Sequence, residues 1–159
     1  MLEYAKNEEN FKLVRCGQIS DEQLISFLES AIANADGHNH FACEIKFSQQ
    51  LIGGCSLLQP SDRTSEMGWV IHSDFWGQGY GTEIGLALLR HGFESLSLHR
   101  IVAKCDSSNH GSYRIMEKLG MRREGLFVES RANKDNSGSP FSDELAYAIL
   151  EREWRGMQN

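Results

Sequence analysis

The chain has 159 residues, of which 40% are hydrophobic and 24% charged, as is typical of one globular domain with a single core. Its net charge of −6 argues against a general nucleic-acid-binding protein, which needs a basic face, and is compatible with a cationic partner. No apolar run approaches the roughly 20 residues needed to cross a bilayer, and the N-terminus lacks the apolar core of a signal peptide. We therefore predict a single cytoplasmic domain over residues 1–159, with no nucleic-acid and no membrane partner.

The first half of the chain is predicted to form two helices and three strands. Leu2–Glu9 is expected to be a short helix. Ser20 and Gln23 make a capping-box pattern before a second helix, which Gly37 is expected to end. Turn-forming residues at 48–50 and 60–63 separate the strands. The three expected strands are Phe41–Phe47, Leu51–Leu58 and Ser65–His72.

The second half alternates strands and helices. A glycine-rich segment at 76–81 opens a long helix that extends to Leu96, and a polar turn at 106–109 opens another that ends at Gly120. Residues 133–140 are too polar to pack. Three strands are expected in this half: Arg100–Cys105, Phe127–Ser130 and Glu144–Leu150. This order of elements predicts an α+β layer fold on a mixed sheet.

Three glycines at alternate positions lie between a predicted strand and a predicted helix: Gly77, Gly79 and Gly81. Glycine allows positive φ and close backbone approach, and helix-start N–H groups attract anions, so the pattern fits a diphosphate-bearing ligand. The alternative is a tight turn without a ligand. A Walker loop would need a lysine that is missing here. A dinucleotide fingerprint has a different glycine spacing, although Asp106 after the next strand leaves that interpretation open.

The four cysteines and six histidines form no metal-site pattern. No CxxC spacing occurs and the histidines are scattered, so we expect no zinc site and no other bound metal. The cysteines lie in apolar stretches, where a free thiol usually acts as a small hydrophobic group. They are predicted to be inert core thiols, with a reactive thiol as the alternative: Cys16, Cys43, Cys55 and Cys105.

Two motifs, in this order and at this separation, resemble those of the GNAT superfamily of N-acetyltransferases. Glu66–Ile71 followed by Phe75–Glu83 resembles the superfamily's motif A. Asn109–Met121 resembles the motif around the next cofactor helix, and Asp143–Trp154 resembles the closing strand. Trp76, where the general superfamily has Arg or Gln, is typical of the branch that contains the ribosomal-protein N-acetyltransferases (Rim-type). The similarity covers almost the whole chain.

The resemblance implies the GNAT fold, a mixed and mostly antiparallel sheet with helices on both faces. One parallel pair is expected to splay, between the strand that ends near His72 and the strand Arg100–Cys105, and acetyl-CoA would lie there. The family's first strand has no counterpart before Leu2–Glu9 and is expected to be missing. We expect a symmetric homodimer to cover the strand edge that this leaves; the alternative is a monomer whose N-terminal segment covers it.

The resemblance also assigns cofactor contacts residue by residue. The backbone of Trp69, Val70 and Ile71 is expected to hold the pantetheine arm of acetyl-CoA, which Asn109 would also contact. Arg114 would either reach the cofactor's phosphates or face water. The loop expected to hold the pyrophosphate consists of Trp76, Gly77, Gln78, Gly79, Tyr80, Gly81 and Thr82.

The activity implied is transfer of an acetyl group from acetyl-CoA, as cosubstrate, to a primary amine by direct attack in a ternary complex. Glu66 is the candidate general base, with a solvated strand residue as the alternative. Many GNAT enzymes carry a tyrosine acid where this chain has Met116. Ser112, four residues earlier on the same helix face, is therefore the candidate for a cofactor contact and for stabilising the thiolate, or is only a small residue for close packing. A strand N–H near Val70 or Ile71 would stabilise the carbonyl oxygen.

Two other functions are kept as alternatives. The missing tyrosine and first strand motivate a non-catalytic acyl-CoA-binding or regulatory module on the same fold. The glycine loop alone would also fit a nucleotide-binding enzyme. The residues do not specify the acceptor: a protein N-terminus, a polyamine, an antibiotic amine and an amino acid all remain compatible with them.

Overall fold

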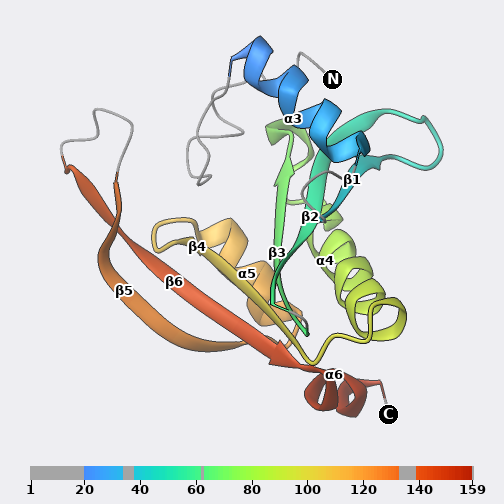
Figure 1. Ribbon diagram of the computed structural model, residues 1–159. Coiled ribbons are helices and arrows are strands. Elements are labelled where there is room, and N and C mark those ends of the chain that lie inside the picture. Colours follow the sequence, from blue (N-terminus) through green and yellow to red (C-terminus); the bar gives the residue numbers. More distant parts are fainter. Residues whose placement is uncertain (1–19, 34–37, 62, 133–138, 159) are drawn as a thin grey trace.

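The computed structural model describes residues 20–33, 38–61, 63–132 and 139–158. The strands are β1 (Asn39–Glu44), β2 (Leu51–Ser61), β3 (Thr64–Ile71), β4 (Arg100–Asp106), β5 (Arg122–Ala132) and β6 (Phe141–Leu150). The helices are α3 (Asp21–Ala33), α4 (Tyr80–Arg90), α5 (His110–Lys118) and α6 (Glu151–Met157). The strands form one sheet in the order β1-β2-β3-β4-β6-β5 (Figure 1). The helix expected at 2–9 and the expected absence of a first strand lie outside the described residues.

The N-terminal elements follow local sequence signals, with one shift. The capping box at the start of α3 is confirmed, because Ser20 N–H donates to Gln23 Oε1 at 2.9 Å and Gln23 N–H donates to Ser20 Oγ at 3.2 Å. The strand expected at 41–47 was placed too late: β1 ends at Glu44 and residues 46–48 form the turn. Phe47 at this turn is fully exposed, so its apolar character marks no buried strand position.

The C-terminal elements differ more from expectation. β5 covers eleven residues, against the four expected at 127–130, because a strand at a sheet edge can carry polar residues on both faces. The strand expected at 144–150 begins earlier, at Phe141, and ends at Leu150 as expected; Trp154, the last residue of the motif that resembles the family's closing strand, lies in α6. Glu153 starts this helix, because its carboxylate accepts a hydrogen bond from Leu150 N–H at 2.8 Å.

Helices cover both faces of the mixed sheet, as expected. Neighbouring pairs are antiparallel except β3 and β4, which are parallel. The rings of His40 in β1 and Phe27 in α3 are in contact, whereas Phe41, the next residue of β1, contacts His91 after α4. Since consecutive strand residues point to opposite faces, α3 and α4 lie on opposite sides of the sheet. Within the described ranges, no helix has the length and apolar character that a membrane crossing requires.

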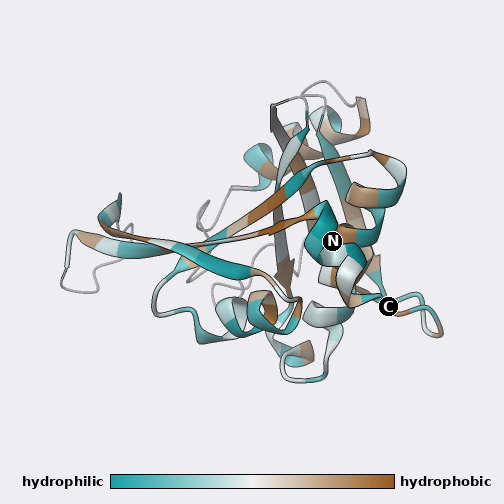
Figure 2. Cartoon of the chain, turned by 90° about the horizontal axis from the view of Figure 1, so that it is seen from below, coloured by the Kyte–Doolittle hydropathy of each residue, from teal (hydrophilic) through white to brown (hydrophobic). Residues whose placement is uncertain are grey.

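The core lies between the sheet and the helices α4 and α5. Figure 2 shows hydrophobic residues concentrated in the central strands. Leu89, Ile101, Leu119 and Ile149 are at most 1% exposed, and burying such a side chain contributes about 1.5–3 kcal/mol. Close packing of α4 on α5 depends on glycine, because a Cβ on Gly81 would lie only 2.5 Å from a side-chain carbon of α5.

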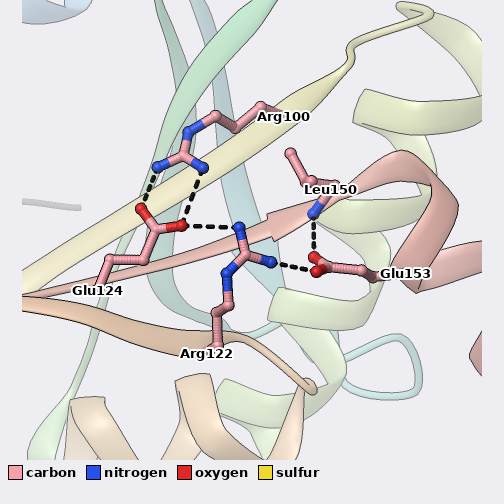
Figure 3. A network of polar contacts seen from close by, with 5 residues as sticks. All are labelled: Arg100, Arg122, Glu124, Leu150 and Glu153. Atoms are coloured by element: carbon pink, nitrogen blue, oxygen red, sulfur yellow. Dashed lines mark hydrogen bonds and ion pairs between the residues drawn. The ribbon is translucent and has the colours of Figure 1, made fainter.

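A network of charged side chains closes the end of the sheet near α6 (Figure 3). Arg100 of β4 makes a bidentate pair with Glu124 of β5, and Arg122 bridges Glu124 to Glu153 of α6. The hydrogen bonds from Arg100 lower the pKa of Glu124, and those from Leu150 N–H and Arg122 lower the pKa of Glu153. The network thus joins three elements that are far apart in the chain.

Candidate active site

Strands β3 and β4 separate partway along their length. Only Thr64–Glu66 of β3 pairs with β4, opposite Arg100–Val102. Beyond these residues, Met67–Ile71 remains paired to β2 and Ala103–Asp106 remains paired to β6. The space between these two diverging segments is called the split below (Figure 1). The splayed parallel pair expected of the fold is confirmed.

Backbone groups of β3 point into the split at alternate residues. His72 N–H donates to Ile52 O of the β2 side at 2.8 Å. Because the N–H and C=O groups of an antiparallel strand alternate between its two neighbours, those of Val70 also face β2, and those of Trp69 and Ile71 face the split. Of the three residues expected to hold the pantetheine arm, Trp69 and Ile71 therefore present their backbone to the split, and Val70 does not.

The glycine-rich loop adopts a conformation that few other residues could adopt. Gly77 and Gly79 have φ of 72° and 90°, and Gly79 is the N-cap of α4 without a side-chain capping hydrogen bond. The indole Nε1 of Trp76 donates to Ile71 O at 2.7 Å and so joins the loop to the end of β3. A helix N-terminus without a side-chain cap, beside an open strand edge, fits the diphosphate and pantetheine of a CoA thioester.

The opposite side of the split ends in the turn that carries Asn109. Asn109 is the N-cap of α5, and its Oδ1 accepts a hydrogen bond from Ser112 N–H at 3.0 Å. The carboxamide nitrogen is thereby oriented away from the helix, as a donor. Met116 is 1% exposed in the core, half-buried Ser112 lies one turn before it, and Arg114 is exposed. These positions leave the roles expected for Ser112 and Arg114 as predictions.

Glu66 is the last residue of β3 that is paired with β4, and its side chain is 24% exposed. Its Oε2 lies 3.4 Å from Nζ of Lys104, whose side chain is 30% exposed. The ion pair therefore spans the inner end of the split, on the face opposite α4 and α5. Sequence analysis did not single out Lys104. Its position could have been predicted from the alternation of side chains along the strand: Ile101 and Ala103 are buried in the core, so Lys104 points to the opposite face.

A second charged group lies at the outer end of β4. Asp106 accepts hydrogen bonds from Ser108 N–H at 2.9 Å and Ser108 Oγ at 2.6 Å. Arg131 of β5 lies 3.4 Å from Asp106 and 3.9 Å from Glu144 of β6. Burial alone would raise the pKa of Asp106, but the Ser108 hydrogen bonds and the Arg131 charge outweigh it and hold that pKa below its ordinary value. The group fixes the Asn109 turn to the hairpin of β5 and β6.

A mixed sheet with a split parallel pair, a glycine-rich helix start at one side and an asparagine turn at the other defines a protein that binds acyl-CoA. The family model described as an acetyltransferase (GNAT) domain matches residues 1–122. The chain therefore belongs to the GNAT family.

Similar proteins agree with this assignment. YnaD of Bacillus subtilis (strain 168), an uncharacterized N-acetyltransferase, is 34% identical over 96% of this chain and 86% of its own length. The crystal structure of a GNAT-family acetyltransferase from Bacillus anthracis is 34% identical, with a TM-score of 0.82 over 94% of this chain and 86% of that one. A spermidine N-acetyltransferase from Vibrio cholerae, in complex with CoA and spermine, shares the fold at 19% identity, with a TM-score of 0.83 over 96% and 89%.

Family and relatives together establish the activity at the level of its class. The chain is an acetyl-CoA-dependent N-acetyltransferase, which transfers an acetyl group to an amine. The split brings together the groups that the sequence predicts for this chemistry: the start of α4 without a side-chain cap, the strand backbone of β3 and the carboxylate of Glu66.

Proposed function

We propose that this chain, acting as a single domain over residues 1–159, acetylates a primary amine by direct attack on acetyl-CoA in a ternary complex. The observation that carries the proposal is Glu66 at the inner end of the split, next to strand backbone that faces the thioester position. A carboxylate there can accept the proton that an attacking ammonium must lose. Phe75 and Trp76 before the glycine loop favour the Rim-type branch of the family.

The net charge of the chain favours a cationic amine. The chain carries a net charge of −6, and the carboxylates of Glu66, Asp106 and Glu144 lie along β3, β4 and β6 together with the cations of Lys104 and Arg131. Since negative charge attracts cations, this balance supports an acceptor such as a protein N-terminus or a polyamine. The Vibrio cholerae enzyme bound to spermine makes spermidine and spermine the first small molecules to test.

Each step can be assigned to groups of this chain. The backbone N–H groups of the glycine loop from Gln78 to Thr82 bind the pyrophosphate, and the Trp69 and Ile71 backbone aligns the pantetheine arm. The Ile71 N–H donates to the carbonyl oxygen as negative charge develops there. Glu66 removes the amine proton, and Ser112 donates a hydrogen bond to the departing thiolate sulfur. The serine hydroxyl is a weak acid, so it stabilises the thiolate without full proton transfer.

The test is an acceptor panel. Purified protein is mixed with acetyl-CoA and, separately, with spermidine, spermine, peptides that carry free N-termini and amino acids, while CoA release is measured against a blank without acceptor. Acceptor-dependent release with formation of an N-acetyl product is the expected result. Tight CoA binding in a thermal-shift assay without release for any amine would instead favour the non-catalytic acyl-CoA-binding module.

A further inference from the structure

Two cysteines face each other across strands β1 and β2. The Sγ atoms of Cys43 and Cys55 lie 3.5 Å apart, and both side chains are half-buried. Cys43 pairs with Gly53, and Cys55 pairs with Phe41, so the two thiols are diagonal neighbours. Residues at such positions point to the same face of the sheet. Of the cysteines that the structure describes, only Cys105 is buried in the core as expected, whereas Cys43 and Cys55 are partly exposed.

The environments of the thiols differ. The hydrogen bond with Cys55 lowers the pKa of Cys43, against the opposing effect of burial, and raises the pKa of Cys55. Burial raises the pKa of Cys105 in β4 to about 11, and that side chain is only 7% exposed. The Sγ atoms of Cys43 and Cys55 are within reach of each other, whereas Cys105 is protected by burial. In the proposal below, Cys43 is the nucleophile and Cys55 resolves it.

We propose that Cys43 and Cys55 are a redox modification site, which closes to a reversible disulfide when the chain meets a hydroperoxide. The Cys43 thiolate attacks one peroxide oxygen, forms a sulfenic acid and releases hydroxide. The Cys55 sulfur then attacks the sulfenic sulfur and expels the hydroxyl group as water. In total, the two thiols lose two protons and two electrons, and one hydrogen peroxide is reduced to two water molecules. A dithiol reductant reverses the reaction.

The bond would fasten the edge of the sheet. Among the strands of the described residues, β1 is the outermost on this side, and the ring of Phe27 in α3 contacts that of its His40. The second neighbour of β2 is β3, in which Trp69 pairs with Cys55 and presents its backbone to the split. A covalent link between β1 and β2 would therefore restrain the edge strand β1, which α3 contacts. It would do so next to β3, the strand proposed to hold the pantetheine arm. The inference rests on the thiol geometry and holds whichever amine the enzyme acetylates.

The experiment uses the full chain, reduced and then treated with a small excess of hydrogen peroxide. Free thiols, counted in denaturant, are expected to fall from four to two per chain, and peptide mapping without reductant is expected to join Cys43 to Cys55. Hydrogen exchange in β1 is expected to slow and to recover after dithiothreitol, because the bond suppresses local opening of the edge.

Variants make the assignment specific. Cys105→Ser is the matched control and should form the bond as the wild type does. Cys55→Ser should leave a sulfenic acid on Cys43 that a sulfenic-acid-specific probe labels. The proposal is overturned if Cys43 and Cys55 remain thiols while other cysteines oxidise, or if the new bonds involve Cys16 or join two chains. Acetyl transfer measured in parallel on the reduced protein tests the enzyme activity separately, so either result can fail without the other.

Discussion

At the level of single residues, Glu66 carries the chemistry proposed for this enzyme. We predict that Glu66→Gln lowers kcat by about 100-fold at pH 7, because a general base contributes on the order of 100-fold or more. The defect should shrink as the pH rises, since a growing share of the amine is then already deprotonated. Ser112→Ala should cost less than about tenfold, because a CoA thiolate leaves readily. Steady-state kinetics from pH 7 to 9.5 measures both. A Glu66→Gln enzyme with wild-type kcat throughout would show that positioning alone carries the rate.

In the proposed mechanism, Lys104 competes with the acceptor for Glu66. Its ammonium lies 3.4 Å from the carboxylate that is proposed as the base. A partly exposed pair of this kind is worth about 0.5–1 kcal/mol, so Lys104→Met should lower KM for a cationic amine roughly two- to fivefold. KM for acetyl-CoA should not change. Lys118→Met, a change of an exposed lysine on α5, is the control. A raised amine KM in Lys104→Met would instead make Lys104 part of the acceptor site.

At the level of elements, the glycine loop at the start of α4 is the most constrained segment. A Cβ on Gly79 would have open space, but the φ of 90° is strained for any other residue. Gly79→Val should therefore cost about 1–2 kcal/mol of stability, leave the fold intact and weaken CoA binding at least about tenfold. Gly156→Val in α6, which also has open space but no positive φ, is the matched control. Calorimetry on both variants decides; unchanged CoA affinity in folded Gly79→Val contradicts a pyrophosphate site.

The β4–α5 turn depends on an ionised Asp106. Since its pKa is lowered in the folded chain, its contribution to stability is present above the unfolded pKa of about 3.9 and is lost as the pH falls through the folded value. Asp106→Asn should cost about 2 kcal/mol at pH 7, and the difference from wild type should shrink as the pH falls below the unfolded pKa of about 3.9. Urea unfolding at pH 7 and below that pKa measures it, with exposed Asp74→Asn as the control. A difference that does not depend on pH would mean that Asp106 acts through packing alone.

Sequence signals found the elements whose cause is local and missed the contacts that depend on register. The capping box at Ser20 and the glycines of the loop act through their own backbone, so they could be read before the structure was known. Lys104 meets Glu66 only because β3 and β4 run parallel, and Cys43 meets Cys55 only through the pairing of β1 with β2. No local pattern encodes those pairings. The helix α6 was missed because its N-cap is Leu150, which is not among the residues that usually mark a helix start.

At the level of the whole molecule, the two edges of the sheet differ. β1 ends one side, and β5 ends the other, where its hairpin with β6 extends away from the body (Figure 1 and Figure 2). Four apolar side chains on the two faces of this hairpin, here together called the hairpin patch, are between 45% and 69% exposed: Leu126, Phe127, Val128 and Phe141. β5 also carries an irregularity between Phe127 and Arg131, which hinders the addition of another strand. A partner is therefore expected to cover this edge by side-chain contacts and not by adding a strand to β5.

We predict that the enzyme is a two-fold dimer in solution and that the hairpin patch forms its contact, because several large exposed apolar side chains on one hairpin commonly mark an interface. Light scattering at micromolar concentration should give twice the chain mass of 18.0 kDa. Val128→Asp, which buries a charge in the contact, should return the mass to that of one chain without loss of fold. Phe47→Asp, at the fully exposed turn next to the other edge, should leave the dimer intact. A single-chain mass for the wild type would favour a monomer whose N-terminal segment covers the β1 edge, whereas a dimer lost only in Phe47→Asp would move the contact to that edge.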